Sequence, residues 1–211
     1  MKSFNGLSLP QTLDEWVDPA RTALLVYDMQ IGIVRQVKGA EAVVDRIATL
    51  VAAARKAGMR IAFCRHNSLP KPWTGAAAMR TAMAWQRKDD PADVACWFLR
   101  DAEGTAIVPA LAPQPEDMVF DKIAMSAFEG TWLATALRDA GLSGLAIAGI
   151  AMEIGIEPTC RHAADLGFVP ILIEDACGAG HAEAAARSIE ALRFAGDTII
   201  TTQADFLAAL G

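Results

Sequence analysis

The chain has 211 residues, of which 53% are hydrophobic, and a formal net charge of −6. This length favours a single domain spanning residues 1–211 with a large buried core. The negative charge and the lack of a basic run argue against nucleic acid and anionic membrane surfaces as partners. No apolar run of about 18 residues predicts a membrane span, and the start lacks the apolar segment of a secretory signal. We therefore expect a cytoplasmic protein.

The four cysteines lie far apart and form no CxxC pair; they are Cys64, Cys96, Cys160 and Cys177. This spacing does not indicate a disulfide framework or a zinc site. We expect reduced, mostly buried thiols, consistent with a cytosolic protein.

Strand-like and helix-like segments alternate from the start of the predicted core. Thr22–Asp28 is an apolar run with few polar residues before its end, which predicts a buried strand. A helix follows, with one apolar face made of Val43, Ile47, Leu50, Val51 and Ala54. Gly58 is a helix stop signal, and Met59–Cys64 is the second predicted strand.

The region from Arg65 to Asp117 is long for one crossover between strands. It is rich in proline and contains Trp73, Trp85 and Trp97, with a predicted helix at about 76–87. An insertion at the carboxyl edge of a sheet, here at about 66–116, suggests a lid or a substrate wall. The alternative is that the tryptophans are core or subunit contacts.

The second half of the chain continues the alternation. The expected elements are, in order, a strand at Met118–Phe120, a helix at about 130–140, a strand at Leu145–Gly149, a helix at about 155–166, a strand at Val169–Ile173, a helix carrying Ala185, Ile189 and Leu192, a strand at Thr198–Ile200 and a helix at Ala204–Leu210. This pattern predicts an α/β fold: one three-layer α/β/α domain with a mostly parallel, roughly six-stranded, Rossmann-like sheet. Ligands of such sheets bind at the carboxyl ends of the strands.

Two charged residues end predicted strands at that edge. Asp28 follows a run of apolar residues, where an unpaired carboxylate would be costly, so it is either functional or bonded to neighbouring turns. Lys122 ends Met118–Lys122 and would either pair with Asp28 and keep it ionised, or stabilise developing negative charge. The alternative for Lys122 is a solvated surface side chain.

The stretch from Gly149 to Glu157 joins a predicted strand to a predicted helix. Such a turn directs free N–H groups and the positive end of the helix at one spot, which suits an oxyanion or a carboxylate. Gly155 lies in this turn. It is either part of the site or a glycine required by tight backbone geometry.

Three motifs occur in a characteristic order. They are Tyr27–Gln30 after an apolar strand, Asp121–Lys122 followed by Ser126–Phe128, and Ala148–Ala151 leading into a helix. With them the chain resembles the isochorismatase-like hydrolases, which include nicotinamidase, N-carbamoylsarcosine amidohydrolase and isochorismatase. The resemblance extends from about Ala20 to the end.

The resemblance implies a site built from Asp28, Lys122 and the turn from Ile150 to Gly155. It also implies a non-proline cis peptide before Ala151, whose amide helps to form an oxyanion hole; we expect the Ala151 and Gly155 amides to stabilise negative charge. Amidase members use the aspartate as base for a cysteine thiol, and that thiol belongs at Gly155, so a covalent thioester is excluded there.

Two other thiols are candidates for a substitute nucleophile. Cys160 lies about 7.5 Å further along the predicted helix and is rotated away from the site. Cys64, at the end of the second strand, is a comparable alternative.

Some members of the family that resemble isochorismatase also carry glycine at this position. They cleave a vinyl ether by proton transfer and water attack, with the aspartate as the acid-base group. Ala151–Glu153 lacks the Tyr-Ala-His sequence typical of such isochorismatases, so isochorismate is not the expected substrate.

Substrate-binding residues are expected around this edge. Gln30 would support the site from the strand end, Arg65 would recognise an anionic group, His66 would orient a substrate or cap a loop, and Phe128 of the second motif would contact substrate. Only His66 resembles the metal ligands of nicotinamidases, and no second histidine is near. We therefore expect no metal and no cofactor.

The sequence thus predicts a hydrolase of a small carboxylate-, amide- or enol-ether-containing metabolite that works without a cysteine nucleophile. One alternative is a binding protein that has lost catalysis. Others are an amidohydrolase with an unusual nucleophile and a structural subunit whose tryptophan-rich insertion forms an interface. Homo-oligomers are common in this family, and we expect one here.

Overall fold

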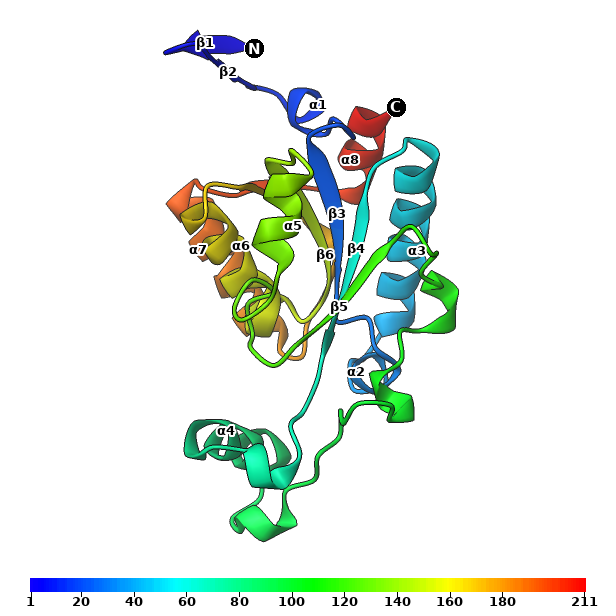
Figure 1. The fold of residues 1–211 in the computed structure, drawn as a ribbon, viewed down its shortest axis with the longest axis vertical. Helices are drawn as coiled ribbons and strands as arrows, with labels where there is room; N and C mark the ends of the chain where they lie inside the picture. The colour runs from blue at the N-terminus through cyan, green and yellow to red at the C-terminus, as the bar shows by residue number, and fades with distance from the viewer.

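A six-stranded parallel sheet forms the centre of the computed structural model, which describes residues 1–211 (Figure 1). Its strands lie in the order β5 (Met118–Lys122), β4 (Ile61–His66), β3 (Thr22–Tyr27), β6 (Gly144–Ile150), β7 (Val169–Gly178) and β8 (Ile199–Thr201). Every neighbouring pair is parallel. The predicted α/β fold is confirmed.

Helices cover both faces of the sheet (Figure 1). One face carries α3 (Ala40–Lys56) and α8 (Gln203–Leu210), and the other carries α5 (Leu133–Asp139), α6 (Glu157–Asp165) and α7 (Ala182–Ala195). The apolar stripe predicted for the first of these helices is buried throughout. Because both faces are covered, every residue of β3 and β6 is buried, which explains why these strands are nearly continuous apolar runs.

The order of the strands reverses between β3 and β6. From this pair the chain adds β4 and β5 on one side and β7 and β8 on the other. A crevice outside the carboxyl ends of the strands at such a switch point is the usual ligand site of open α/β sheets. Asp28 follows β3, and the turn at 151–156 follows β6, so both lie at this point.

Several boundaries differ from the prediction. The second strand begins at Ile61 rather than Met59, because the Met59 N–H closes the end of α3 on the Ala54 carbonyl. The helix expected from Gly155 begins as a π-helix over Met152–Ile156, which continues into α6.

An N-terminal segment that the sequence did not predict projects from the body (Figure 1). It is an exposed antiparallel hairpin, β1 (Lys2–Phe4) and β2 (Leu7–Leu9). The short helix α1 (Leu13–Trp16), which follows, packs beside α8. A second short helix, α2 (Ile31–Val34), follows the first strand of the main sheet.

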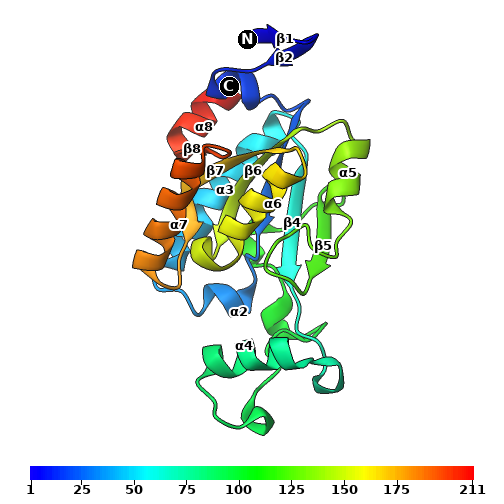
Figure 2. The same cartoon turned by 90° about the vertical axis from the view of Figure 1, so that its left-hand side faces the viewer.

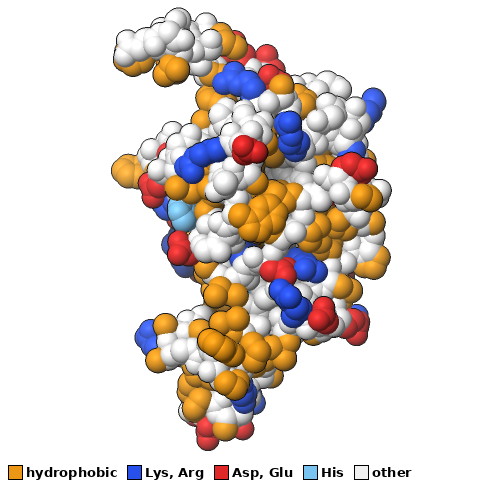
Figure 3. All heavy atoms as spheres, viewed as in Figure 1, with side chains coloured by type: hydrophobic (Ala, Val, Ile, Leu, Met, Phe, Trp, Pro, Cys, Tyr) orange, Lys and Arg blue, Asp and Glu red, His pale blue; other side chains and the backbone are white.

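The long region after β4 forms a protrusion at the carboxyl edge of the sheet (Figure 2). It contains α4 (Ala76–Gln86), one residue shorter than predicted, and 3-10 turns at Lys71–Trp73, Pro91–Asp93, Glu103–Thr105 and Pro109–Leu111. Hydrophobic side chains gather on its surface in Figure 3. Trp73, Trp85 and Trp97 are 78%, 54% and 47% exposed, so they are not core residues. None of the helices combines the length and the apolar character needed to cross a membrane.

Candidate active site

Asp28 ends the central strand in an uncommon backbone conformation. Its φ is +49°, a left-handed value that few residues other than glycine adopt. Its N–H donates to the Cys64 carbonyl at 3.2 Å, the last step of the ladder with β4. Residues in this strained region cluster at functional sites. The conformation ends β3, and the carboxylate contacts residues of β4 and β5.

Lys122 and Asp28 form a buried ion pair. The Lys122 Nζ lies 2.8 Å from Asp28 Oδ2 and also donates to the Ala124 carbonyl at 3.2 Å. The lysine side chain is 0% exposed and the aspartate side chain 7%. Two residues that the sequence placed at separate strand ends are therefore in contact across β4. Of the pair, the aspartate is the one that solvent still reaches.

The second oxygen of Asp28 accepts a hydrogen bond from Cys64. The Cys64 Sγ lies 3.3 Å from Asp28 Oδ1, and the residue is 1% exposed. Burial, together with the negative charge of Asp28, raises the pKa of the Cys64 thiol well above its usual value. The thiol is therefore neutral at pH 7 and serves as a hydrogen-bond donor to the carboxylate.

The turn after β6 is built around the Ala151 carbonyl. The Ile150–Ala151 peptide is cis, as the resemblance implied. The Ala151 carbonyl accepts the N–H groups of Ile154, Gly155 and Ile156 at 3.3, 3.1 and 3.2 Å. The Gly155 amide is thus already bonded and is not the free donor that we expected. The Ala151 amide makes no hydrogen bond to protein and remains available.

The phenol of Tyr27 fills the space beside Gly155. A Cβ built on Gly155 would lie 1.8 Å from the Tyr27 Oη. The hydroxyl donates to the Met125 carbonyl, and the Lys122 Nζ lies 4.4 Å from the centre of the Tyr27 ring. Burial raises the pKa of Tyr27 well above 10, so the phenol is neutral at pH 7.

Gln30 connects β4 to the returning end of the insertion. Its side-chain oxygen accepts the His66 N–H at 2.6 Å, and its side-chain nitrogen donates to the His66 and Thr105 carbonyls at 3.0 and 3.2 Å. Gln30 is 0% exposed. These backbone contacts occupy the amide, so Gln30 positions His66 rather than presenting a free group.

His66 lies beside the ion pair. It is on the same face of β4 as Cys64, because the two residues are two positions apart on the strand. Its ring packs edge-on against Phe98 at 6.0 Å. Burial and the positive charge of Lys122 lower the pKa of His66 from its usual 6.5. A neutral imidazole next to Asp28 and Lys122 is suited to orient a polar substrate group.

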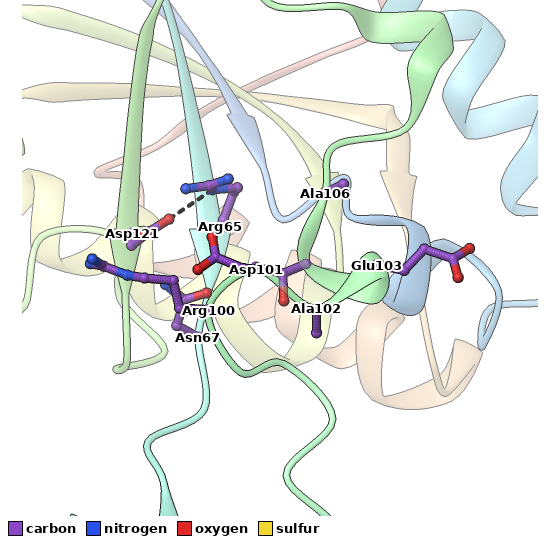
Figure 4. Close-up of a pocket in the computed structure, with 9 residues that line it drawn as sticks. Arg65, Asn67, Arg100, Asp101, Ala102, Glu103, Ala106 and Asp121 are labelled. Carbon is purple, nitrogen blue, oxygen red and sulfur yellow. Dashed lines mark hydrogen bonds and ion pairs between the residues drawn. The ribbon is translucent and has the colours of Figure 1, made fainter.

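Arg65 points to the other face of β4 and does not join Asp28. Its Nε donates to Asp121 Oδ1 at 2.7 Å, and it lines a separate pocket of about 270 Å³ with Asn67 and Arg100 (Figure 4). That pocket carries both signs of charge, and Glu103 turns away from Arg65 (Figure 4). An anion-binding role for Arg65 would therefore belong to this neighbouring pocket.

Phe128 is also outside the cluster. Its ring stacks on Phe168 at 5.7 Å with an angle of 18° between the planes, and it is 5% exposed. The ring belongs to the core beneath α5 and α6. A direct substrate contact by Phe128 remains a prediction that this packing does not favour.

The donor set at this edge does not match a metal site. No group of three or more His, Cys, Asp or Glu side chains is arranged to hold an ion. His66 is the one histidine beside Asp28, and the adjacent sulfur is a neutral thiol that already donates to Asp28. No metal-dependent step is therefore assigned to these residues.

Sequence reasoning missed Tyr27 as a site residue and considered Cys64 only as a substitute nucleophile. The signal for Tyr27 was its place in the first motif, next to Asp28, together with the glycine at 155. The signal for Cys64 was its position at the end of the strand that pairs with β3, where Tyr27 and Cys64 are register partners.

Comparison with known proteins identifies the family of the chain. The family model described as the isochorismatase domain matches residues 22–204. The chain is 33% identical over 169 residues to the isochorismatase family protein YecD of Escherichia coli O157:H7, covering 77% of this chain and 82% of that protein. It is 27% identical over 197 residues to the ureidoacrylate amidohydrolase RutB of Variovorax paradoxus (strain S110), covering 81% of this chain and 76% of that protein.

The fold is shared with solved structures as well. A cysteine hydrolase from Pseudomonas syringae pv. phaseolicola 1448A superposes with a TM-score of 0.76 at 24% identity, covering 91% of this chain and 93% of that chain. The family model over residues 22–204 and the 33% identity to YecD show that the chain belongs to the isochorismatase family. It is a hydrolase of that family, with glycine at the position that the resemblance assigns to the nucleophile.

Proposed function

We propose that the protein hydrolyses a small metabolite by water attack, with Asp28 as the acid-base group and no covalent sulfur intermediate. The observation that carries the proposal is the buried Asp28–Lys122 pair, 2.8 Å apart, beside a turn whose position 155 has no side chain. The expected substrates contain a carboxylate, an amide or an enol ether.

Each group at the site has one task in this reaction. Asp28 takes a proton from the attacking water and returns it to the leaving atom, so that the carboxylate is regenerated. Lys122 holds the carboxylate in place, and the free Ala151 amide donates to the oxygen on which negative charge develops. His66, neutral and fixed through Gln30, orients the polar end of the substrate.

Hydrolysis by a Cys64 thiolate is the second candidate. It is favoured by the contact of 3.3 Å between the Cys64 Sγ and Asp28, a potential base, and by amidohydrolases among the relatives. The raised pKa of the thiol and its 1% exposure oppose it, because a nucleophile must be both ionised and reachable.

The test is a comparison of variants on a panel of small amides, carboxylates and enol ethers. The double variant Asp28→Asn/Lys122→Met removes the acid-base group without leaving a buried unpaired charge. We expect a folded protein whose kcat/KM falls by about 100-fold or more. Cys64→Ala is expected to retain activity within about threefold, and iodoacetamide to inhibit little.

Either of two results would reject water attack. One is retained activity in the double variant. The other is loss of activity in Cys64→Ala in a protein that circular dichroism shows to be folded, which would favour the thiolate reaction.

A further inference from the structure

Tyr27 and Gly155 face each other at the switch point of the sheet. Tyr27 is the last residue of β3 and pairs in register with Cys64 on one side and Gly149 on the other. Its side chain points to the face covered by α5 and α6 and is 2% exposed. Gly155 lies in the π-helix that packs over this ring.

The phenol occupies the volume that a side chain at position 155 would need. A Cβ there would lie 1.8 Å from the Tyr27 Oη, 2.4 Å from Cζ and 2.7 Å from Cε1. Real Cβ atoms essentially never approach other heavy atoms to less than 3.0 Å. The oxygen alone is not responsible, because the ring carbons are also too close.

The ring has little freedom to give way. The Tyr27 hydroxyl is tied to the Met125 carbonyl on the loop after β5. The Lys122 ammonium lies 4.4 Å from the ring centre, a cation–π distance, while it also binds Asp28. Moving the ring would break both contacts, so a larger residue at position 155 would have to displace the Tyr27 ring at the cost of both.

We propose that Tyr27 is the residue that commits this site to water attack, because its side chain excludes a thiol from position 155 while its ring positions Lys122. Tyr27 and Gly155 are then a matched pair: the large side chain on β3 fills the space that the glycine on the turn leaves open. Tyr27 is a positioning residue and not a nucleophile, since its phenol is neutral at pH 7. The chemical consequence depends on the function proposed above, but the steric claim does not.

The steric claim is tested by a stability cycle that needs no substrate. Gly155→Ala is expected to lower the urea midpoint by roughly 1 M, because it overpacks a filled site. The same Gly155→Ala change is expected to lower the midpoint much less in the Tyr27→Val background, where the double variant is compared with Tyr27→Val alone. Gly75→Ala is the matched control, since a Cβ there has nothing within 4 Å. Gly75 is the N-cap of the exposed helix α4, so we expect the midpoint to fall much less than in Gly155→Ala.

The chemical claim is tested with a thiol placed at position 155. Cys96→Ser is the background, because Cys64 and Cys160 are buried and Cys177 has a pKa of about 12. In this background Gly155→Cys is made in three proteins, one that keeps Tyr27, one with Tyr27→Phe and one with Tyr27→Val. The readout is the rate of iodoacetamide labelling at position 155, measured by peptide mass spectrometry.

We expect labelling at least tenfold faster with Tyr27→Val than with Tyr27 or Tyr27→Phe, since phenylalanine keeps the carbons at 2.4 and 2.7 Å. A Gly155→Cys protein that fails to fold unless Tyr27→Val is present supports the same conclusion. An unchanged urea midpoint in Gly155→Ala, or equal labelling in all three backgrounds, would overturn it. Neither result depends on the activity assay, so it leaves the proposed function to be decided by the Asp28 variants.

Discussion

The switch-point edge and the protruding insertion are opposites in their construction. At the edge, the side chains of Asp28, Gln30 and Lys122 are buried and make hydrogen bonds to several strands. In the insertion, α4 buries no residue and three tryptophans are largely exposed. The edge is thus held by tertiary contacts between strands that are distant in sequence, whereas the insertion is held mainly by local turns.

This difference indicates where chemistry and variability reside. Buried polar clusters are rigid because every partner that is lost leaves an uncompensated group behind. Exposed segments with few buried contacts tolerate change and open first. We therefore expect substitutions of Asp28, Gln30 or Lys122 to reduce both stability and turnover, and substitutions in the insertion to change neither by much.

The largest expected effect is at Lys122. Lys122→Met leaves Asp28 buried without its partner, which costs about 3–5 kcal/mol in the free energy of unfolding, and we expect turnover to fall by at least about 100-fold. Lys71→Met is the matched change in the insertion, where the exposed ammonium donates only to the Ala92 carbonyl; we expect it to cost less than about 0.5 kcal/mol. Urea unfolding measures both, and equal losses would contradict the contrast.

Two glutamines offer a closer comparison, because each bonds in both directions to the backbone of one residue. Gln30 bonds to His66 and is buried, whereas Gln86 bonds to Ala95 in the insertion at 2.8 and 2.9 Å. Gln30→Ala should lower the free energy of unfolding by about 2–3 kcal/mol, because it leaves buried backbone groups unpaired and creates a cavity where the side chain was. Gln86→Ala should cost less than about 1 kcal/mol because water replaces its contacts.

The two variants are compared by their urea midpoints and m-values. If Gln86→Ala lost as much stability as Gln30→Ala, burial would not be what distinguishes the two glutamines.

The fold was predictable from the sequence because burial on both faces makes parallel strands nearly continuous apolar runs. Thr22–Tyr27 and Gly144–Ile150 could be recognised for this reason, and Gly58 marked the end of α3. The exposed hairpin at residues 2–9 gave no such signal, because its strands bury nothing. A π-helix differs from an α-helix in its hydrogen bonds and not in its residue types, so Met152–Ile156 was also missed.

The site was predictable as a set of residues but not as a set of contacts. Asp28 and Lys122 were predicted because charged residues ended apolar strands, and the structure places them 2.8 Å apart. Successive residues of a strand point to opposite faces, but the predicted strand ended at Cys64. Arg65 and His66 were therefore grouped, although β4 continues through both of them. That Tyr27 fills the space at Gly155 required coordinates.

A smaller effect is expected from His66 as pH falls. Its folded pKa lies below the usual 6.5, so the unfolded chain takes up the proton first. The stability that this histidine contributes is therefore present above about pH 6.5 and decreases as pH falls below it, until the folded pKa is reached. We expect the free energy of unfolding to fall over that window, and to fall less in His66→Gln.

The measurement is a series of urea unfolding curves at pH 7.5, 6.5 and 5.5 for both proteins. Carboxylates that titrate in the same range contribute to both series, so the difference between the two slopes isolates His66. If the free energy of unfolding changed with pH equally in both proteins, His66 would protonate as readily in the folded protein as in the unfolded chain.

The smallest effect on stability is expected at the exposed tryptophans of the insertion. Trp73 is 78% exposed, so Trp73→Ser should change the free energy of unfolding of the isolated chain by no more than about 0.5 kcal/mol. The homo-oligomer and the interface role of the insertion remain predictions, and the same variants test them. If copies of the chain meet through these side chains, Trp73→Ser and Trp85→Ser will delay elution in size-exclusion chromatography and make the urea midpoint independent of protein concentration. Unchanged elution, with the parent protein running at the size of an oligomer, would place the contact between copies outside the insertion.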